Sequence, residues 1–226
     1  MLRIFIGYDS REVAAYQVCA HSIIKHATQP VSITPLNIRH LTGFTNTDYK
    51  ASTEFAFSRF LVPYLCDYQD RALFLDCDML VRTDIAKLFE LGDDNDVMCV
   101  KHKYEPSTDE KFLGAVQTSY RKKNWSSVML FNNPQCERLS KHFVNTQPGL
   151  ALHQFEWTSK VGELGTNWNH LVGEYPKYAD ADIVHFTLGG PYFDKYRHCE
   201  YADEWWQAWA ESNSVLDIKT LGENNV

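Results

Sequence analysis

The sequence has no long hydrophobic run, since no uninterrupted apolar stretch approaches the ~20 residues that a membrane-spanning helix needs. A secretory signal is missing as well, because the short apolar run from Leu2 to Ile6 has no basic segment before it and leads directly into a turn. The six cysteines include no C-x-x-C pair, which argues against a zinc ribbon or a thioredoxin-like redox site. These absences predict a cytoplasmic protein whose cysteines are mostly buried thiols.

Positive charge is also scarce, because 22 lysines and arginines face 29 aspartates and glutamates, giving a formal net charge of −7. A surface of this sign repels nucleic acid and anionic lipid, and the longest basic run is only Arg121-Lys122-Lys123. Core material is abundant: 44% of the 226 residues are hydrophobic and 14% are aromatic, which excludes a disordered chain. This length and composition favour a single domain over residues 1–226.

Short apolar runs alternate with helical patterns from the first residue onward, and this alternation predicts an α/β fold in which helices connect the strands of a layered sheet. The expected strands cover residues 2–6, 31–36, 72–75, 96–100, 127–131 and 183–186. One helix is expected to run from Ser10, as its N-cap, to Lys25. A second helix is expected over residues 58–65, with a weak point at Pro63.

Two further segments lack a clear period. Residues 105–124 are polar and mixed, and residues 147–169 are rich in Gly, Trp and His; in an α/β enzyme we expect such segments to be loops around the ligand site, with a surface excursion as the alternative. The tryptophan-rich run at residues 205–209 is expected to dock a helix onto the body of the protein, the alternative being a face for a partner.

The pattern Asp-x-Asp occurs three times, and its context separates the copies. Asp94/Asp96 and Asp180/Asp182 lie in polar turns before strands, where solvated carboxylates are the natural interpretation. Only the pair Asp76 and Asp78 follows an apolar strand, which places it at the strand's carboxyl end, where open α/β sheets bind ligands. Residues two apart on an extended chain point to the same side, so both carboxylates can face one ligand.

A pair of carboxylates next to a core strand repels itself unless a cation bridges it, so Asp76 and Asp78 are predicted to hold a divalent metal. Hard oxygen ligands suit Mg²⁺ or Mn²⁺, and such an ion lets a nucleotide diphosphate approach an acidic site. The ion would also stabilise charge on a diphosphate leaving group. The alternative is two partly exposed acids at a strand end, with no ligand.

Several segments in matching order resemble glycosyltransferase family 8 enzymes. They are the first strand and its turn at 5–9, an arginine-containing helix at 58–63, the acidic strand at 71–81, a central strand at 128–132, a Trp-Asn turn at 165–169 and a late strand at 183–186. The resemblance implies a GT-A fold, which is Rossmann-like with a mixed, mostly parallel sheet flanked by helices. It also implies a nucleotide-sugar donor, in the first place a UDP-sugar.

The resemblance further implies which residues act. The protein ligands of Mn²⁺ or Mg²⁺ would be Asp76, Asp78 and His185. The residues facing the nucleotide sugar would be Gly7, Tyr8, Asp9, Arg59 and Asp76. Independently of the family, an imidazole at the end of an apolar run completes a carboxylate–imidazole set that favours Mn²⁺ over Ca²⁺. A lone histidine there would otherwise be a core residue.

Three segments depart from the family pattern and suggest an outlying, bacterial-type branch. After His185 the chain reads Thr187-Leu188-Gly189-Gly190, where the family usually has a phosphate-contacting lysine. The backbone N–H groups of Gly189 and Gly190 are therefore expected to cradle the phosphate. Trp125-Ser126-Ser127 stands where the family often has Asn-Ser-Gly, and His153-Gln154 where it has an acid followed by glutamine.

The resemblance implies transfer with retention of anomeric configuration. Retaining hydrolases use a carboxylate nucleophile, but an amide is a poor nucleophile, so Gln154 is expected to stabilise a cationic sugar through its carbonyl oxygen. The leaving phosphate would then help to deprotonate the acceptor. Arg59 is the second expected catalytic residue, and Glu156 is the reserve nucleophile for a covalent step. An exposed loop amide is the alternative interpretation of Gln154.

Other functions share parts of this pattern. A haloacid-dehalogenase-like phosphatase also carries Asp-x-Asp after an apolar strand, but that strand usually opens the chain, and a small hydroxyl residue stands where this sequence has Leu80. A catalytically silent nucleotide-sugar- or glycan-binding domain fits the missing lysine and acid. A sugar-nucleotide pyrophosphorylase needs a basic, Gly-rich N-terminal loop, which the sequence lacks. No motif indicates whether the acceptor is a glycan, a lipid-linked sugar or a protein.

Overall fold

The computed structural model describes residues 1–47, 51–103 and 121–214. Its main sheet has six strands in the order β2-β1-β3-β6-β5-β7. These strands are β1 (Leu2–Gly7), β2 (Val31–Leu36), β3 (Arg71–Leu75), β5 (Val97–Val100), β6 (Val128–Asn132) and β7 (Val161–Leu164). Within this sheet β6 runs antiparallel to its neighbours, and the other pairings are parallel. The predicted α/β fold with a mixed, mostly parallel sheet is confirmed.

A smaller sheet has the order β4-β9-β8 and consists of β4 (Met79–Val81), β9 (Ile183–His185) and β8 (His170–Leu171). The chain leaves the main sheet after Leu75 and joins the smaller one at Met79. The apolar run around the acidic pair is therefore divided between two sheets, and residues 76–78 form the crossing. This crossing places Asp76 at the carboxyl end of β3, as the sequence predicts.

Helix α1 (Val13–His26) begins later than expected, so the prediction of Ser10 as its N-cap is wrong. Glu12 holds the N-cap position, and the Ser10 hydroxyl instead donates to Glu54 Oε1 at 2.6 Å. Residues 58–65 change helix type at Val62. A 3-10 turn (Ser58–Leu61) precedes the short helix α2 (Val62–Leu65), in which Pro63 occupies an early position that tolerates a missing N–H.

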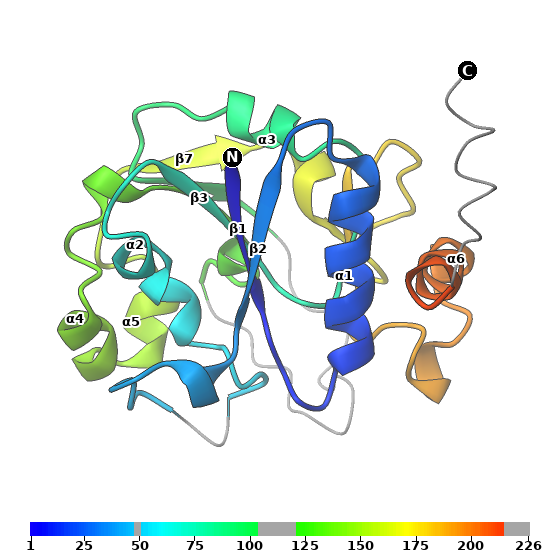
Figure 1. The fold of residues 1–226 in the computed structure, drawn as a ribbon, viewed down its shortest axis with the longest axis horizontal. Coiled ribbons are helices and arrows are strands. Elements are labelled where there is room, and N and C mark those ends of the chain that lie inside the picture. Colours follow the sequence, from blue (N-terminus) through cyan, green and yellow to red (C-terminus); the bar gives the residue numbers. More distant parts are fainter. Residues whose placement is uncertain (48–50, 104–120, 215–226) are drawn as a thin grey trace.

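The remaining helices are α3 (Ala86–Glu90), α4 (Lys141–Thr146), α5 (Gly149–His153) and α6 (Ala202–Ser212). Figure 1 shows α2, α4 and α5 on one side of β1 and β2, with α1 and α6 on the opposite side. Helix α6 packs against α1, and its Trp205 is buried. The predicted docking of the tryptophan-rich run is therefore confirmed. None of the helices in the described ranges combines the length and apolarity that crossing a bilayer requires.

The prediction of loops over residues 147–169 is wrong for much of that segment. It contains α5, β7 and a 3-10 turn (Thr166–Asn169). Helix α5 has five residues and β7 has four, which is too short for a hydrophobic period to develop in the sequence. Most of the other expected loop, 105–124, lies outside the described residues, and its last residues form turns that lead into a 3-10 turn (Trp125–Ser127).

The buried apolar side chains form two clusters. The larger cluster fills the main sheet and the elements that cover it. The smaller cluster lies between the second sheet, α1 and α6, and includes Leu80, Val184, Phe186 and Trp205. After the acidic pair the chain contacts both clusters in alternation, since Met79 and Val81 are buried in the larger cluster and Leu80 in the smaller one.

Candidate functional site

Three of the predicted site residues converge at the crossing between the two sheets. Asp76 and Asp78 follow β3, and His185 ends β9, whose antiparallel pairing with β4 sets Met79 opposite His185. One ligand atom from each of the three side chains lies within 4.8 Å of the others. Asp78 Oδ1 is 3.4 Å from His185 Nε2. Two carboxylates and an imidazole at this spacing fit a divalent cation such as Mn²⁺.

Asp76 is held by a buried arginine. Arg59 Nη1 donates to Asp76 Oδ1 at 2.7 Å, and also to the Ser126 carbonyl at 2.9 Å. Its Nε donates to the Ala56 carbonyl, and the guanidinium lies 5.1 Å and 5.0 Å from the ring centroids of Phe55 and Phe74. The repulsion predicted between two carboxylates is thus reduced on the Asp76 side, because Arg59 balances the charge of Asp76 before any cation binds.

Arg59 is 5% exposed and hence belongs to the interior. Arg59 lies in the 3-10 turn Ser58–Leu61. Its guanidinium has five hydrogen-bond donors in a planar fork, so this one side chain can bind Asp76 and two backbone carbonyls. In this structure Arg59 therefore supports the carboxylate of Asp76.

His185 is oriented by a buried amide. Its Nδ1 lies 2.9 Å from Asn169 Oδ1, and its Nε2 faces Asp78. Asn169 is the last residue of the predicted Trp-Asn turn, and its sequence pattern predicts no contact with His185. A metal-bound histidine commonly uses its second nitrogen for such a contact.

A buried glutamate next to the acidic pair was missed by sequence reasoning. Glu12 is 2% exposed, and the Tyr192 hydroxyl donates to its Oε1 at 2.7 Å. Burial raises the pKa of Glu12 to about 8, and the charges of Asp78 and Asp9 act in the same direction. No signal in the sequence distinguishes Glu12 from an ordinary polar residue at the start of a helix.

The predicted nucleotide turn lies at the same edge of the main sheet. Strand β1 is parallel to β3, with Ile6 opposite Leu75, so Gly7, the last residue of β1, lies at the same sheet edge as Asp76, which follows β3. A Cβ atom at Gly7 would lie 2.4 Å from the Phe55 ring, which explains the glycine. The Tyr8 ring meets the Tyr16 ring edge-on, with centroids 5.5 Å apart.

Asp9 is fully buried and holds its own turn together. Its carboxylate accepts hydrogen bonds from the backbone and guanidinium of Arg11 and from the Glu54 N–H. Burial alone raises the pKa of Asp9, but these hydrogen bonds outweigh it and leave the pKa below its usual value. Arg11 also donates to the Ser52 carbonyl, so Asp9 joins the nucleotide turn to residues 52–54.

The glycines after His185 form a tight turn. The Gly189 N–H donates to the Phe186 carbonyl at 2.8 Å, and Gly189 has a φ of +139° that favours glycine. A Cβ atom at Gly190 would lie 2.2 Å from the Tyr192 ring. The Gly189 N–H thus closes a turn over residues 186–189, which begins directly after His185 and contains the buried Thr187.

Gln154 caps the C-terminal end of α5, and its carbonyl accepts from Lys122 Nζ at 2.6 Å. The preceding His153 contacts Ser126 Oγ at 2.8 Å, and the Ser126 carbonyl accepts from Arg59, so this end of α5 is linked to Asp76. Burial, assisted by the charge of Arg59, lowers the pKa of His153 to about 3. The imidazole is therefore neutral near pH 7 and does not replace the family's acid.

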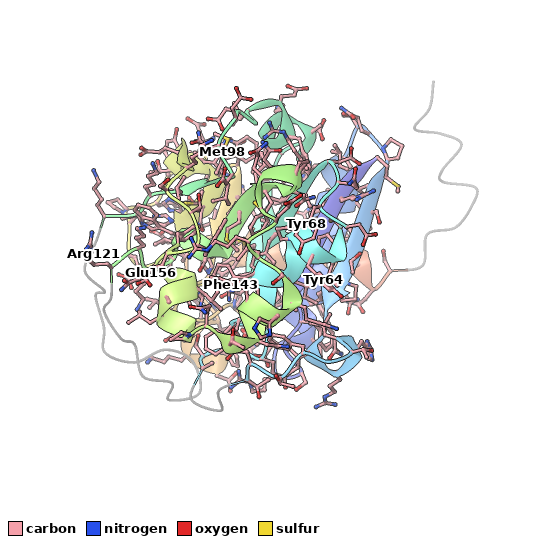
Figure 2. The ribbon with its side chains drawn as sticks, turned by 90° about the vertical axis from the view of Figure 1, so that its left-hand side faces the viewer. Tyr64, Tyr68, Met98, Arg121, Phe143 and Glu156 are labelled. Carbon is pink, nitrogen blue, oxygen red and sulfur yellow. The ribbon has the colours of Figure 1, made fainter. Side chains whose placement is uncertain are left out.

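Glu156 and the other two Asp-x-Asp pairs lie apart from this constellation. Glu156 is exposed at the periphery of the molecule (Figure 2). Asp94 and Asp180 are also exposed, whereas Asp96 accepts a hydrogen bond from Thr158 Oγ1 and Asp182 one from Asn167 Nδ2. Their positions agree with solvated or structural carboxylates.

Residues 10–140 match the family model described as glycosyl transferase family 8. The chain belongs to glycosyltransferase family 8. Protein CDI of Arabidopsis thaliana is 45% identical to it over 225 residues, which cover 93% of this chain and 87% of that protein. Family membership excludes the haloacid-dehalogenase-like phosphatase and identifies this enzyme as a glycosyltransferase that uses a nucleotide sugar.

Solved structures agree on the fold of this family 8 enzyme. The bifunctional glycosyltransferase WbbM superposes with a TM-score of 0.66 at 15% identity, over 98% of this chain and 51% of that one. The chain thus spans about half the length of WbbM. Galactosyltransferase LgtC, solved in complex with donor and acceptor sugar analogs, superposes with a TM-score of 0.61 at 14% identity, over 98% of this chain and 100% of that one. These likenesses establish the GT-A fold.

Proposed function

We propose that this family 8 enzyme transfers a hexosyl group from a UDP-sugar to a glycan, a lipid-linked sugar or a protein, with retention of anomeric configuration. Asp76, Asp78 and His185 would hold Mn²⁺ or Mg²⁺ between the two sheets. The observation that carries the proposal is the convergence of their three ligand atoms within 4.8 Å at the carboxyl end of β3. When bound, such a cation offsets the charge that develops on the diphosphate leaving group.

The chain's own residues would divide the remaining work. Gly7, Tyr8 and Asp9 would form the floor for the nucleoside, because β1 ends beside β3 at the same sheet edge. Arg59 would hold the Asp76 carboxylate in place, and its positive charge would lie close to the nucleotide sugar. The turn containing Gly189 and Gly190 would flank the diphosphate, since it follows His185 directly.

Gln154 would stabilise the cationic sugar, and Glu156 would serve only if a covalent step exists. The hydrogen-bonded path from Gln154's neighbour His153 through Ser126 to Arg59 supports a position of α5 next to the acidic pair. With His153 neutral, this side of the site supplies no acid, which favours a front-face reaction in which the leaving phosphate accepts the acceptor's proton.

The proposal also includes a cytoplasmic location, a single domain over residues 1–226 and a bacterial-type branch. All six cysteines are free thiols and five of them are buried, which supports a reducing compartment. Tyr192 packs against both apolar clusters, which supports a single cooperative unit.

A panel of nucleotide sugars, each with and without Mn²⁺, tests the proposal through the shift in melting temperature and through release of nucleoside diphosphate. We expect a UDP-sugar to stabilise the protein only when Mn²⁺ is present, and slow hydrolysis of the same donor to release UDP. Mn²⁺-dependent stabilisation without any UDP release, with water or a panel of acceptors, would favour the catalytically silent binding domain. No stabilisation by any nucleotide sugar would contradict both functions.

A further inference from the structure

Four groups form a row of hydrogen bonds that ends at His185. The Ser127 hydroxyl is 2.7 Å from the backbone carbonyl oxygen of Asn124, and Asn169 Nδ2 is 2.8 Å from Ser127 Oγ. Asn169 Oδ1 is in turn 2.9 Å from His185 Nδ1. The side chains of Ser127, Asn169 and His185 are at most 2% exposed, so no bulk water competes for these contacts.

The chemistry of the groups fixes the direction of every bond in the row. The Asn124 carbonyl can only accept, so the Ser127 hydroxyl donates its single proton to it. Ser127 Oγ must then accept from Asn169, which turns the amide NH₂ toward the serine. Asn169 Nδ2 also approaches the Asn124 carbonyl at 3.3 Å, which agrees with the same orientation.

This orientation determines the tautomer of His185. With its NH₂ facing Ser127, the Asn169 amide presents its carbonyl oxygen to His185 Nδ1. A carbonyl oxygen only accepts, so Nδ1 must carry the proton in the neutral ring. The lone pair of Nε2 then points toward Asp78, whose Oδ1 is 3.4 Å away.

The row is anchored at the backbone of the site itself. Asn124 has a left-handed backbone with a φ of 60°, and its side chain donates to Thr187 Oγ1 at 3.1 Å. The Asp76 N–H donates to the Ser127 carbonyl at 2.9 Å. Ser127 therefore contacts the backbone of one expected ligand and, through Asn169, the ring of another.

We infer that Asn169 and Ser127 are positioning residues that fix the His185 ring in the Nδ1–H tautomer and thereby keep Nε2 ready for a divalent cation. The inference rests on the proposed function, because it takes His185 as a ligand of that cation. It also gives a role to Ser127, which lies in one of the segments that depart from the family pattern. Groups that orient a ligating histidine in this way typically change metal affinity about 10–100-fold when removed.

The test has two readouts, neither of which depends on turnover. The first is the ¹⁵N spectrum of the histidine rings in the cation-free protein, with the His185 signals assigned by their loss in His185→Gln. We expect a protonated Nδ1 and a bare Nε2 in the wild type, and a mixture of tautomers in Asn169→Leu. The second readout is the dissociation constant for Mn²⁺ alone, which should rise about 10–100-fold in Asn169→Leu.

Two variants and a control separate orientation from packing. Asn169→Asp retains an acceptor for Nδ1–H, so it should keep the tautomer and bind Mn²⁺ within a few-fold of the wild type. Ser127→Ala leaves the Asn169 NH₂ with only the longer contact to the Asn124 carbonyl and should raise the dissociation constant several-fold. Asn167→Leu is the matched control, because Asn167 lies in the same 3-10 turn but donates to Asp182 instead of reaching His185. Its Mn²⁺ affinity should be unchanged.

A proton on Nε2 in the wild type, or unchanged Mn²⁺ affinity in a folded Asn169→Leu, overturns the inference. Should Asn169→Leu fail to fold, Ser127→Ala and Asn169→Asp decide: wild-type affinity in Ser127→Ala, or loss of Mn²⁺ binding by Asn169→Asp, also overturns it. Failure of the proposed function looks different, since the wild type itself would then not bind Mn²⁺, while the tautomer in the cation-free protein is measured all the same.

Discussion

Asp76 and Asp78 are separated by one residue, yet different regions of the molecule hold them. Asp76 belongs to the main sheet, and the buried guanidinium of Arg59 is 2.7 Å from its carboxylate. Asp78 leads into the smaller sheet, where it faces the His185 ring at 3.4 Å and adds to the charge around the buried Glu12. The protein balances one carboxylate with a permanent cation and surrounds the other with an imidazole and a further acid.

This difference shows that the two halves of an Asp-x-Asp pair can have separate physical roles. On the Asp76 side the carboxylate already has a buried guanidinium partner, and we expect removal of one member of this ion pair to lower the stability of the fold. On the Asp78 side, an added divalent cation would gain favourable interactions with Asp78, His185 and the nearby acid. We therefore expect stability to depend on the first side and cation binding to depend most strongly on the second.

The largest expected effect comes from Asp78→Asn. Sugar transfer should fall by about 1,000-fold or more, equivalent to about 4 kcal/mol, because the charge that holds the cation is lost. Stabilisation by UDP with Mn²⁺ should largely disappear, while the cation-free protein melts at the same or a slightly higher temperature. Steady-state kinetics and melting curves measure these effects. Asp180→Asn, at an exposed position, is the control; Mn²⁺-dependent turnover in Asp78→Asn would contradict the assignment.

The next effect concerns the ion pair on the other side. Arg59→Met should lower the free energy of unfolding by about 3–5 kcal/mol, because it leaves the Asp76 charge partly buried without its partner. Asp76→Asn should lower it by about 1–3 kcal/mol, in contrast to Asp78→Asn. Urea unfolding without cation measures all three. Equal free energies of unfolding for Asp76→Asn and Asp78→Asn would contradict the proposed difference between the two carboxylates.

Arg59→Lys sharpens the same point. Lysine keeps the charge but loses the planar fork that reaches Asp76, Ser126 and Ala56 together. Donor affinity should therefore weaken while the requirement of UDP binding for Mn²⁺ remains. Titration with a UDP-sugar at fixed Mn²⁺ measures this, and normal turnover of the donor by Arg59→Lys would contradict a role for Arg59 at the donor.

Glu12 provides a pH test on the Asp78 side. Its pKa is about 8 in the folded protein, above the value near 4.5 of an ordinary glutamate, so the folded state holds its proton more tightly. Its contribution to stability is therefore full below pH 4.5 and is lost as the pH rises through 8. Glu12→Gln should remove this loss and be more stable than the wild type at pH 9 by about 4 kcal/mol, relative to the difference at pH 5. Parallel pH dependences for the two proteins would contradict the burial argument.

The smallest effect is expected far from the site, where Glu211 of α6 accepts from Lys25 of α1 at 2.7 Å. Hydrogen bonds from Lys25 and Gln207 lower the pKa of Glu211 to about 2, so its contribution is present above about pH 4.5 and fades as the pH falls toward 2. The pair is solvent-exposed, and Glu211→Gln should cost only about 0.5 kcal/mol at pH 7. A loss as large as that of Arg59→Met would remove the distinction between buried and surface pairs.

The sequence was most informative where a local pattern is decisive. Strands β1, β2 and β3 were predicted within one residue, because each is a short apolar run bounded by turn residues. Asp76 and Asp78 were separated from the other acidic pairs by the apolar strand before them. His185 needed the family resemblance, since its own surroundings in the sequence equally suit a core histidine.

The missed features depend on contacts between distant segments. The partners of Arg59 and Asn169 lie well away in the chain, and only the folded arrangement of turns and sheets brings them together. Glu12 looks like a solvated residue until Tyr192 covers it. The short strands β4 and β8 contain three and two residues, so the division of the apolar run between two sheets left no trace in its hydrophobic pattern.

The position of Asp76, Asp78 and His185 at the crossing between two sheets has a consequence for how the enzyme folds during synthesis. Asp76 and Asp78 leave the ribosome roughly a hundred residues before His185, and joining them closes a loop of that length. A nascent chain therefore acquires both carboxylates early but gains its imidazole only after β9 has paired with β4. The three side chains thus come together only when the two sheets do, and a divalent ion bound there would reinforce a finished fold instead of guiding its first steps.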